Sequence, residues 1–177
     1  MTTYIALLRG INVGGHKKVA MAELRKLLTK IGLSNVQTYI QSGNIIFHSS
    51  VKNKEELEQK IHHAIQDHFG FDVSVLVRTG LDLQRIFDDC PFNNEKKENS
   101  YFMLLHTNPN DGLIQIASEK MYEGEEYQII NDCLYLYCEK GYGKSKFNMN
   151  YFEKKLQTSA TTRNYKTMLK LLSLLAD

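Results

Sequence analysis

The chain has 177 residues, of which 42% are hydrophobic and 24% charged, with a formal net charge of +2. This length suits one ordinary domain or two small ones, and the hydrophobic content excludes an intrinsically disordered chain. With 11 glycines and only 2 prolines, a collagen or a Pro-rich linker protein is also excluded. A net charge this close to zero does not by itself indicate nucleic-acid binding.

Neither end of the chain has the pattern of an export signal or a membrane anchor. The N-terminus lacks a basic start followed by an apolar run. The apolar segment 169–176 is interrupted by a lysine and a serine and is shorter than the ~20 residues that a bilayer requires. The cysteines, Cys90, Cys133 and Cys138, are odd in number and lack framework spacing. We therefore expect a soluble cytoplasmic protein with reduced thiols and no membrane partner.

The first eighty residues alternate between strand and helix patterns. Four segments have the apolar runs or alternation of strands, and two have the three- and four-residue spacing of amphipathic helices. Asn53 and Glu56 form a candidate capping box for the second helix. The resulting order, β-α-β-β-α-β, is that of ferredoxin-like folds, with another α+β topology as the alternative. The elements are strand 4–8, helix 21–31, strands 36–40 and 45–48, helix 53–70 and strand 71–77.

The second half predicts a modified second α/β plait. Two of its strands are joined by Asn131-Asp132, a two-residue hairpin turn. We expect an α+β protein with a ferredoxin-like subdomain at residues 1–80 and a second subdomain at residues 81–177, packed closely on the first. The elements of the second half are helix 81–89, polar loop 91–100, strand 101–106, helix 112–121, strands 126–130 and 133–139, and helices 149–157 and 163–175.

Charge is distributed unevenly along the chain. Residues 1–80 carry a net charge of +4, residues 81–138 carry −7, and residues 139–177 carry +5. The two basic ends predict one positive surface for an anionic partner, and solvated faces of mixed charge are the alternative.

A glycine-rich loop, Arg9-Gly-Ile-Asn-Val-Gly-Gly-His-Lys-Lys18, lies between the first strand and the first helix. Glycines allow close approach of a ligand to the backbone, and a helix N-terminus offers free N–H groups. Arg9, Lys17 and Lys18 add positive charge. The spacing is not G-x-G-x-x-G, so a dinucleotide fingerprint is absent. An anion-binding loop and a tight turn with a basic rim both fit this segment.

A second polar segment, Gln41-Ser-Gly-Asn44, occupies the first hairpin. A turn requires Gly and Asn for backbone reasons, so a structural role is favoured for most of it. The turn does not require Gln41, which makes that residue the better candidate for ligand contact.

A third segment, Gly141-Tyr-Gly-Lys-Ser145 with Lys146, follows a predicted strand and resembles the end of a Walker A loop. The first glycine of that motif is replaced by Cys138, which argues against a true P-loop. A simpler phosphate- or carboxylate-binding loop and a structural loop remain as alternatives.

The fourth segment, Ala160-Thr-Thr-Arg-Asn-Tyr-Lys-Thr167, is predicted to begin the last helix, with Thr161 or Thr162 as its cap. This places Arg163 and Lys166 in the first turn, where the helix dipole disfavours each cation by ~0.3–1 kcal/mol. A bound anion or an acidic side chain from elsewhere in the fold would offset that cost.

Three weaker patterns have structural alternatives. His63 and Asp67 have metal-ligand spacing on one helix, but no third ligand is evident and no metal or other cofactor is expected. Tyr135 and Tyr137 share one strand face and are candidates for base stacking, although packing is the commoner role of strand aromatics. His16 is a candidate acid/base group if the chain is an enzyme, and no residue pattern identifies a catalytic centre.

Four segments in this order resemble one bacterial family, the domain-of-unknown-function family 1697. The resemblance covers nearly the whole chain and implies a cytoplasmic α+β protein with ferredoxin-like halves. The family has no established activity, so no catalytic residue is implied. Tyr165 and Ala20 depart from the family pattern, which often has Trp and Pro there. The segments are Leu8-Arg-Gly-Ile-Asn-Val-Gly-Gly15, Thr38-Tyr-Ile-Gln-Ser-Gly-Asn44, Gly141-Tyr-Gly-Lys-Ser-Lys146 and Ala160-Thr-Thr-Arg-Asn164.

The leading hypothesis is one binding site for an anionic small molecule, a nucleotide or a phosphorylated metabolite, built from these four segments. Single-stranded nucleic-acid binding on a basic sheet face, an enzyme using the same pocket, and a partner-binding domain without a small ligand are the alternatives. The predicted ligand-binding residues are Arg9, Asn12, Gly14, Gly15, Lys17, Gln41, Asn44, Lys144, Ser145, Lys146, Thr162, Arg163 and Asn164.

Overall fold

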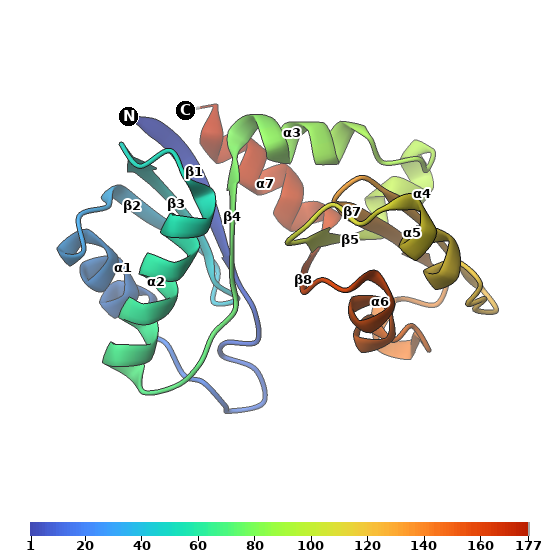
Figure 1. The fold of residues 1–177 in the computed structure, drawn as a ribbon, viewed down its shortest axis with the longest axis horizontal. Coiled ribbons are helices and arrows are strands. Elements are labelled where there is room, and N and C mark those ends of the chain that lie inside the picture. Colours follow the sequence, from blue (N-terminus) through green and yellow to red (C-terminus); the bar gives the residue numbers. More distant parts are fainter. Residues whose placement is uncertain (177) are drawn as a thin grey trace. The chain divides into compact units, whose positions relative to one another are not determined.

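The structure is a computed structural model that describes residues 1–176 (Figure 1). The chain divides into two compact units. The first unit contains Met1–Gln84 and the chain from Leu171 onward, and the second contains Arg85–Lys170. Each unit has its own four-stranded antiparallel sheet, and each is described by itself.

The first unit has the predicted ferredoxin-like order. Its strands pair in the order β2-β3-β1-β4, which is that of the split β-α-β unit. Asn53 caps α2 by accepting a hydrogen bond from the Glu56 N–H at 2.9 Å, as the capping pattern predicts. The elements are β1 (Thr2–Leu8), α1 (Met21–Lys30), β2 (Ser34–Tyr39), β3 (Asn44–Ser49), α2 (Lys54–Phe69) and β4 (Val75–Thr79), followed by α3 (Gly80–Asp88).

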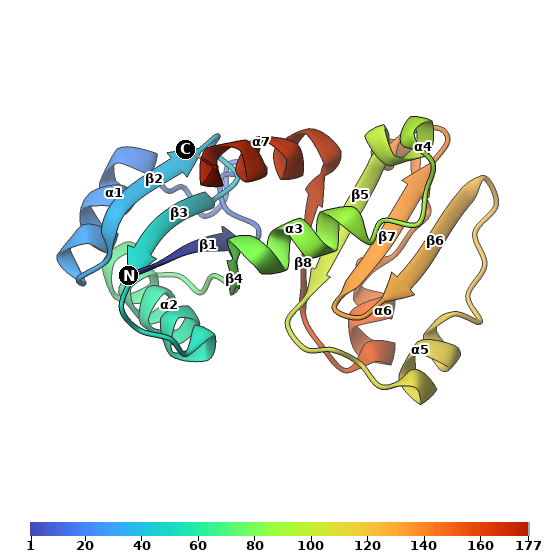
Figure 2. The same ribbon diagram turned by 90° about the horizontal axis from the view of Figure 1, so that it is seen from above.

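The second unit repeats this order more completely than the sequence predicts. Its strands pair as β6-β7-β5-β8, so each has a counterpart in the first sheet (Figure 2). The predicted polar loop 91–100 contains a short helix, α4, capped by Asn93. The elements are α4 (Asn94–Glu98), β5 (Ser100–Leu105), α5 (Asp111–Ala117), β6 (Glu125–Ile130), β7 (Cys133–Cys138), the 3-10 turn η1 (Tyr142–Lys144), α6 (Met149–Leu156), β8 (Ala160–Asn164) and α7 (Tyr165–Leu175).

The predicted helix start at Arg163 is wrong, because residues 160–164 form strand β8 and α7 begins at Tyr165. β8 pairs with β5 over five positions, from Tyr101 opposite Asn164 to Leu105 opposite Ala160. The open side of β5 decides the conformation: it offers a ladder of backbone hydrogen bonds to a segment with two β-branched threonines. Local sequence carried both a capping pattern and strand propensity, and tertiary pairing selected the strand.

The cores explain why the helices lie where they do. In the first unit α1 and α2 cover one face of the sheet and pack Leu24, Leu28 and Ile61 against its strand residues. In the second unit α5 and α6 do the same with Ala117 and Phe152. No helix within residues 1–176 is long and apolar enough to cross a bilayer.

Candidate functional site

In the first unit, Asn12 fastens the glycine-rich loop to the first hairpin. Its Nδ2 donates to the carbonyls of Val19 at 3.0 Å and Gln41 at 2.8 Å, and its Oδ1 accepts from the Val19 N–H at 2.8 Å. The backbone N–H of Leu8 also donates to the Gly43 carbonyl at 2.8 Å. The first two predicted segments therefore lie together, and the Asn12 amide is engaged in holding them.

The two central glycines of that loop serve a turn. Gly14 and Gly15 have φ values of 58° and 76°, and the His16 N–H closes the turn on the Val13 carbonyl at 3.0 Å. This left-handed backbone favours glycine. Nearby, Lys17 Nζ donates a hydrogen bond to the Asp72 carbonyl at 2.5 Å. Lys17, which was predicted to contact an anion, therefore has a partner within the protein.

The first hairpin is mainly structural, as the sequence favours. Asn44 is fully buried, and its Nδ2 donates to the Tyr39 carbonyl and to Ser42 Oγ, both at 3.0 Å. Gln41, in contrast, is exposed. In this unit Arg9, Gly14, Gly15, Lys17 and Gln41 remain predicted ligand contacts, whereas Asn12 and Asn44 have clear structural roles.

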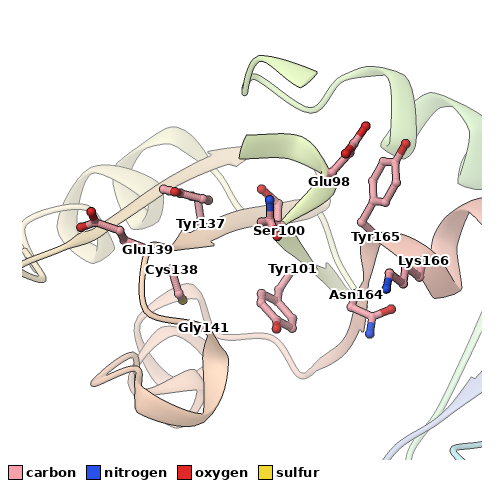
Figure 3. A pocket seen from close by; sticks show the side chains of 11 residues that line it. Glu98, Ser100, Tyr101, Tyr137, Cys138, Glu139, Gly141, Asn164, Tyr165 and Lys166 are labelled. Atoms are coloured by element: carbon pink, nitrogen blue, oxygen red, sulfur yellow. The ribbon is translucent and has the colours of Figure 1, made fainter. Parts of the chain in front are cut away.

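The second unit contains a cavity of about 420 Å³ in which two of the four predicted segments meet (Figure 3). Gly141 comes from the third segment, and Asn164 and Lys166 come from the fourth. Strand pairing explains the meeting, since Ser100 lies opposite Tyr137 and Tyr101 opposite Asn164. The full lining is Glu98, Asn99, Ser100, Tyr101, Tyr137, Cys138, Glu139, Gly141, Asn164, Tyr165 and Lys166.

The N-terminus of α7 forms one wall of this cavity. Asn164 Oδ1 caps the helix by accepting from the Thr167 N–H at 2.9 Å, and Lys166 is exposed within the first turn. The amides of the first helical turn have no partner within the helix and lie at the positive end of its dipole. This wall therefore suits a negatively charged group, with Lys166 as its cation.

Tyr101, Tyr137 and Tyr165 form much of the remaining wall, and the first two pack against aromatic rings outside the lining. The ring of Tyr101 lies 4.7 Å from that of Tyr142 by their centroids, and Tyr137 lies 6.3 Å from Phe92. Figure 3 shows Tyr101 between Tyr137 on one side and Asn164 with Lys166 on the other. Tyrosine offers both a flat apolar surface and a hydroxyl group, which suits a polar ring.

Two carboxylates and a thiol complete the lining. Glu98 and Glu139 are exposed and give the cavity a mixed charge with Lys166. Burial raises the pKa of the Cys138 thiol, although a hydrogen bond with Ser145 opposes that shift. A raised pKa keeps the thiol protonated at neutral pH, so Cys138 is not an activated nucleophile.

A second hollow of about 430 Å³ adjoins the first and shares Cys138, Glu139 and Gly141 with it. The predicted Lys144, Ser145 and Lys146 line this second hollow. Ser145 Oγ accepts from the Phe147 N–H at 2.9 Å, so it serves a local turn. The helix α6 begins only at Met149, whereas a P-loop continues directly into a helix at its Lys-Ser.

Thr162 and Arg163 do not line the cavity of Figure 3. Thr162 Oγ1 lies 3.3 Å from Met149 Sδ. Arg163 is 8% exposed, its Nη1 donates to the Thr162 carbonyl at 2.9 Å, and burial lowers the pKa of its guanidinium to about 10. Because Arg163 lies in strand β8, it is not in the first turn of α7. Of the two cations predicted for that turn, only Lys166 lies in it.

Tyr135 is unsuited to the base stacking considered for it. It is fully buried, and its hydroxyl donates to the Ile86 carbonyl at 2.7 Å. Leu134, Leu136 and Cys138 belong to the core cluster on one face of β7, and Cys133 lies on the opposite face because side chains alternate along a strand. Within residues 1–176, no group of three His, Cys, Asp or Glu side chains is arranged to hold a metal ion.

Several residues that line the cavity of Figure 3 have no sequence pattern that would predict a binding role. Glu98 lies at the end of α4, where a loop was predicted, and Tyr101 and Glu139 read as ordinary strand positions. The pairing of β5 with β7 and β8 brings them together. That pairing depends on contacts between residues 29 to 63 positions apart in the chain.

The family model of a protein of unknown function, DUF1697, matches residues 1–135. No curated protein matches the chain. Among solved structures, the chain is similar to that of the conserved bacterial protein SP0830 from Streptococcus pneumoniae. The two are 29% identical with a TM-score of 0.79, and the match covers 98% of each chain.

Proposed function

The chain belongs to the DUF1697 family, and for this member we propose binding of a small anionic ligand of the nucleotide type in the cavity of the second unit. The observation that carries the proposal is the meeting of an aromatic wall, two carboxylates and the N-terminus of α7 around one cavity. A volume of about 420 Å³ falls within the ~300–1,000 Å³ range of small-molecule sites.

The anionic end of the ligand is assigned to the start of α7. Backbone N–H groups of the first turn and the Lys166 ammonium would donate to phosphate oxygens. α7 has 11 residues, long enough for a developed dipole. The Asn164 amide already caps the helix with its oxygen, so its nitrogen is the group that faces a ligand as a donor.

The carboxylates favour a nucleotide over a compact phosphorylated metabolite. Glu98 and Glu139 would repel a ligand that is anionic along its whole length. They would accept hydrogen bonds from ribose hydroxyls or a ring amino group, while Tyr101 stacks on the ring. A ligand with a phosphate at one end and a donor-bearing ring at the other satisfies both walls.

Calorimetric titration of the full chain with AMP, adenosine and inorganic phosphate tests the proposal. We expect AMP to bind more tightly than either fragment, because each fragment engages only one wall. Lys166→Gln should weaken AMP binding by about tenfold, the equivalent of ~1.4 kcal/mol. Lys154→Gln, a matched change of an exposed lysine on α6 outside the cavity, should leave it unchanged.

Two outcomes would overturn the proposal: no binding of any of the three compounds at millimolar concentration, or equal weakening by both lysine variants. Tight binding of single-stranded RNA with a steep salt dependence, unaffected by Lys166→Gln, would instead support the nucleic-acid alternative. That alternative has less support, because Tyr135 is buried and unavailable to a base.

A further inference from the structure

The strand β6 forms an open and regular edge of the second sheet. Within the described chain it pairs only with β7, in continuous register over its 6 residues. Its counterpart in the first unit, β2, has a register shift between Ser34 and Gln37. Such a bulge protects an edge strand from further pairing, and β6 lacks one.

The hairpin geometry identifies which backbone groups face outward. The turn Asn131-Asp132 leaves Ile130 opposite Cys133 as the closing pair, which is hydrogen-bonded in a two-residue hairpin. Alternate residues then direct their backbone groups away from β7. Tyr127 and Ile129 therefore present N–H and C=O groups at the outer edge of the sheet.

A groove of about 560 Å³ runs along this edge. Its lining includes residues from both faces of the strand, such as Gln128 on one and Tyr127 on the other, so the hollow wraps around the edge itself. Met121 stands in the groove with 84% of its surface exposed. An added strand would cover this side chain and use the outward backbone groups at the same time.

The charge of the groove indicates the character of its occupant. Glu125 and Glu126 line it, no lysine or arginine does, and Glu123 lies two residues before the start of the strand. Glu126 is already paired with Lys96 at 2.5 Å. Glu125 Oε1 accepts from the Lys146 N–H, but its Oε2 is screened from water without a hydrogen-bond partner. The exposed carboxylates of Glu123 and Glu126 are therefore the ones that an incoming basic side chain can reach.

We propose that the β6 edge binds an extended segment of a partner protein, with alternating basic and apolar residues, as an additional strand. Backbone pairing with Tyr127 and Ile129 provides the register, apolar side chains cover Met121, and basic side chains meet the glutamates. A second copy of this chain fits less well, because β6 has no lysine or arginine of its own to meet the glutamates of a second copy. This surface is separate from the cavity proposed for the anionic ligand.

Fluorescence anisotropy with a labelled, end-capped peptide of four Lys-Val repeats tests the proposal on the full chain. We expect this peptide to bind and a Glu-Val counterpart not to bind. N-methylation of the peptide amides on one side should abolish binding, and N-methylation of those on the other side should preserve it. Only strand addition makes that distinction, since both methylated peptides carry the same charge.

Two exposed positions provide variants that do not disturb the fold. Met121→Lys and Glu123→Lys should each weaken binding by about tenfold. Asp67→Lys makes the same charge change as Glu123→Lys at an exposed site on α2 of the first unit, and it should alter binding less than about twofold.

Absence of binding, equal effects of the three variants, or insensitivity to N-methylation would overturn the proposal. Sedimentation provides a further check. If the chain is a dimer that Met121→Lys converts to a monomer, the edge pairs with a second copy and the partner-segment proposal is wrong.

Discussion

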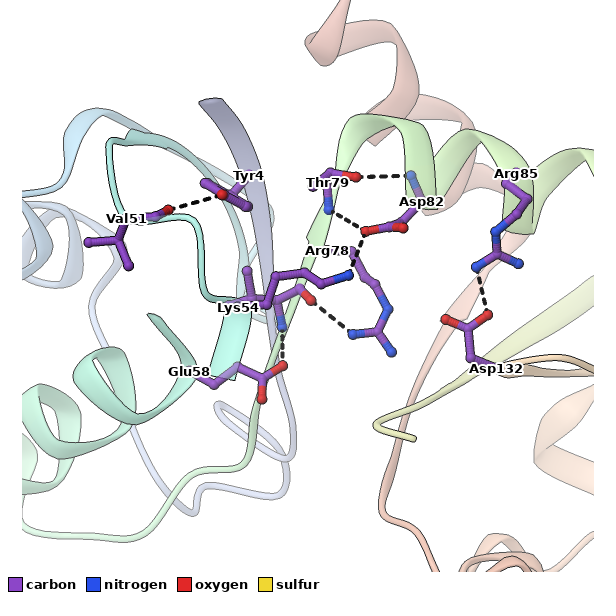
Figure 4. A network of polar contacts seen from close by, with 10 residues as sticks. Tyr4, Val51, Lys54, Glu58, Arg78, Thr79, Asp82, Arg85 and Asp132 are labelled. Atoms are coloured by element: carbon purple, nitrogen blue, oxygen red, sulfur yellow. Dashed lines mark hydrogen bonds and ion pairs between the residues drawn. The ribbon is translucent and has the colours of Figure 1, made fainter. Parts of the chain in front are cut away.

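Arg78 and Arg163 occupy equivalent positions in the two structural units of the chain. Arg78 lies in β4 opposite Ile5, and Arg163 lies in β8 opposite Phe102, in the equivalent strand pair of the other unit. Each is buried, and each donates from Nη1 to the carbonyl of the preceding residue at 2.9 Å (Figure 4 shows Arg78). The next residue caps the following helix in both units, through Thr79 Oγ1 and Asn164 Oδ1. The two halves are therefore equivalent in detail, although no sequence repeat is visible.

We expect Arg78→Ala and Arg163→Ala each to lower the free energy of unfolding by about 1–3 kcal/mol. The reason is that each loses a packed side chain and a hydrogen bond from a charged group. Lysine should not restore stability, because it lacks the planar donor geometry of guanidinium. Urea denaturation followed by circular dichroism measures the effect. Lys154→Ala, a change of an exposed residue, is the control. If either arginine variant were as stable as this control, the equivalent structural role of the two arginines would be contradicted.

Gly43 illustrates a turn glycine that is also a packing requirement. It has a φ of +83°, and a Cβ there would lie 2.5 Å from Leu8 Cβ. Gly15 has a similar φ of +76° but open space around it. Gly15→Ala should therefore cost only the backbone strain, about 1 kcal/mol, and Gly43→Ala should cost a further ~1–3 kcal/mol. Thermal denaturation of both variants compares them, and similar melting temperatures would refute the packing role.

Asp82 should make the chain sensitive to acid. Burial by itself would raise the pKa of Asp82, but hydrogen bonds from the Thr79 N–H and from Lys54 Nζ outweigh burial, and the net shift is downward (Figure 4). Because the folded-state pKa is lower than the unfolded one, this contribution to stability is present at neutral pH. It is lost as the pH falls below about 4.

Asp82→Asn should accordingly be less stable than the parent chain at pH 7, by about 1 kcal/mol, with the difference shrinking as the pH falls below about 4. Urea denaturation across this pH range measures it. Asp111→Asn, at an exposed position in the first turn of α5, serves as the control. A difference that stays constant with pH would exclude the proposed ionisation.

Tyr127 should contribute to alkaline instability. Burial raises its pKa to about 12, and its hydroxyl donates to the Lys120 carbonyl at 2.5 Å. The folded-state pKa exceeds the unfolded value of about 10, so the stabilisation is complete below pH 10 and declines as the pH rises toward 12. Tyr127→Phe should be less stable than the parent by about 1 kcal/mol at pH 7. The difference in unfolding free energy between Tyr127→Phe and the parent chain should shrink above pH 10, as urea denaturation at several pH values would measure. A difference that grows above pH 10 would contradict the raised pKa of Tyr127.

Local patterning determined the first unit from the sequence. The spacing of apolar residues gave the βαββαβ order, and Asn53 identified the start of α2 through its capping interaction. These features depend on residues a few positions apart, where periodicity and capping chemistry act directly. The α+β class and the family resemblance followed from the same information.

Tertiary structure alone decided the conformation of residues 160–164 and the lining of the cavity. The capping pattern around Thr161 favoured a helix, and only the open side of β5 made the segment a strand. The same pairing placed Tyr101 and Lys166 around one cavity and moved Arg163 from a helix start into a buried strand position. Such outcomes depend on hydrogen-bond ladders between distant segments, whose free energy outweighs local propensity and leaves no local signature.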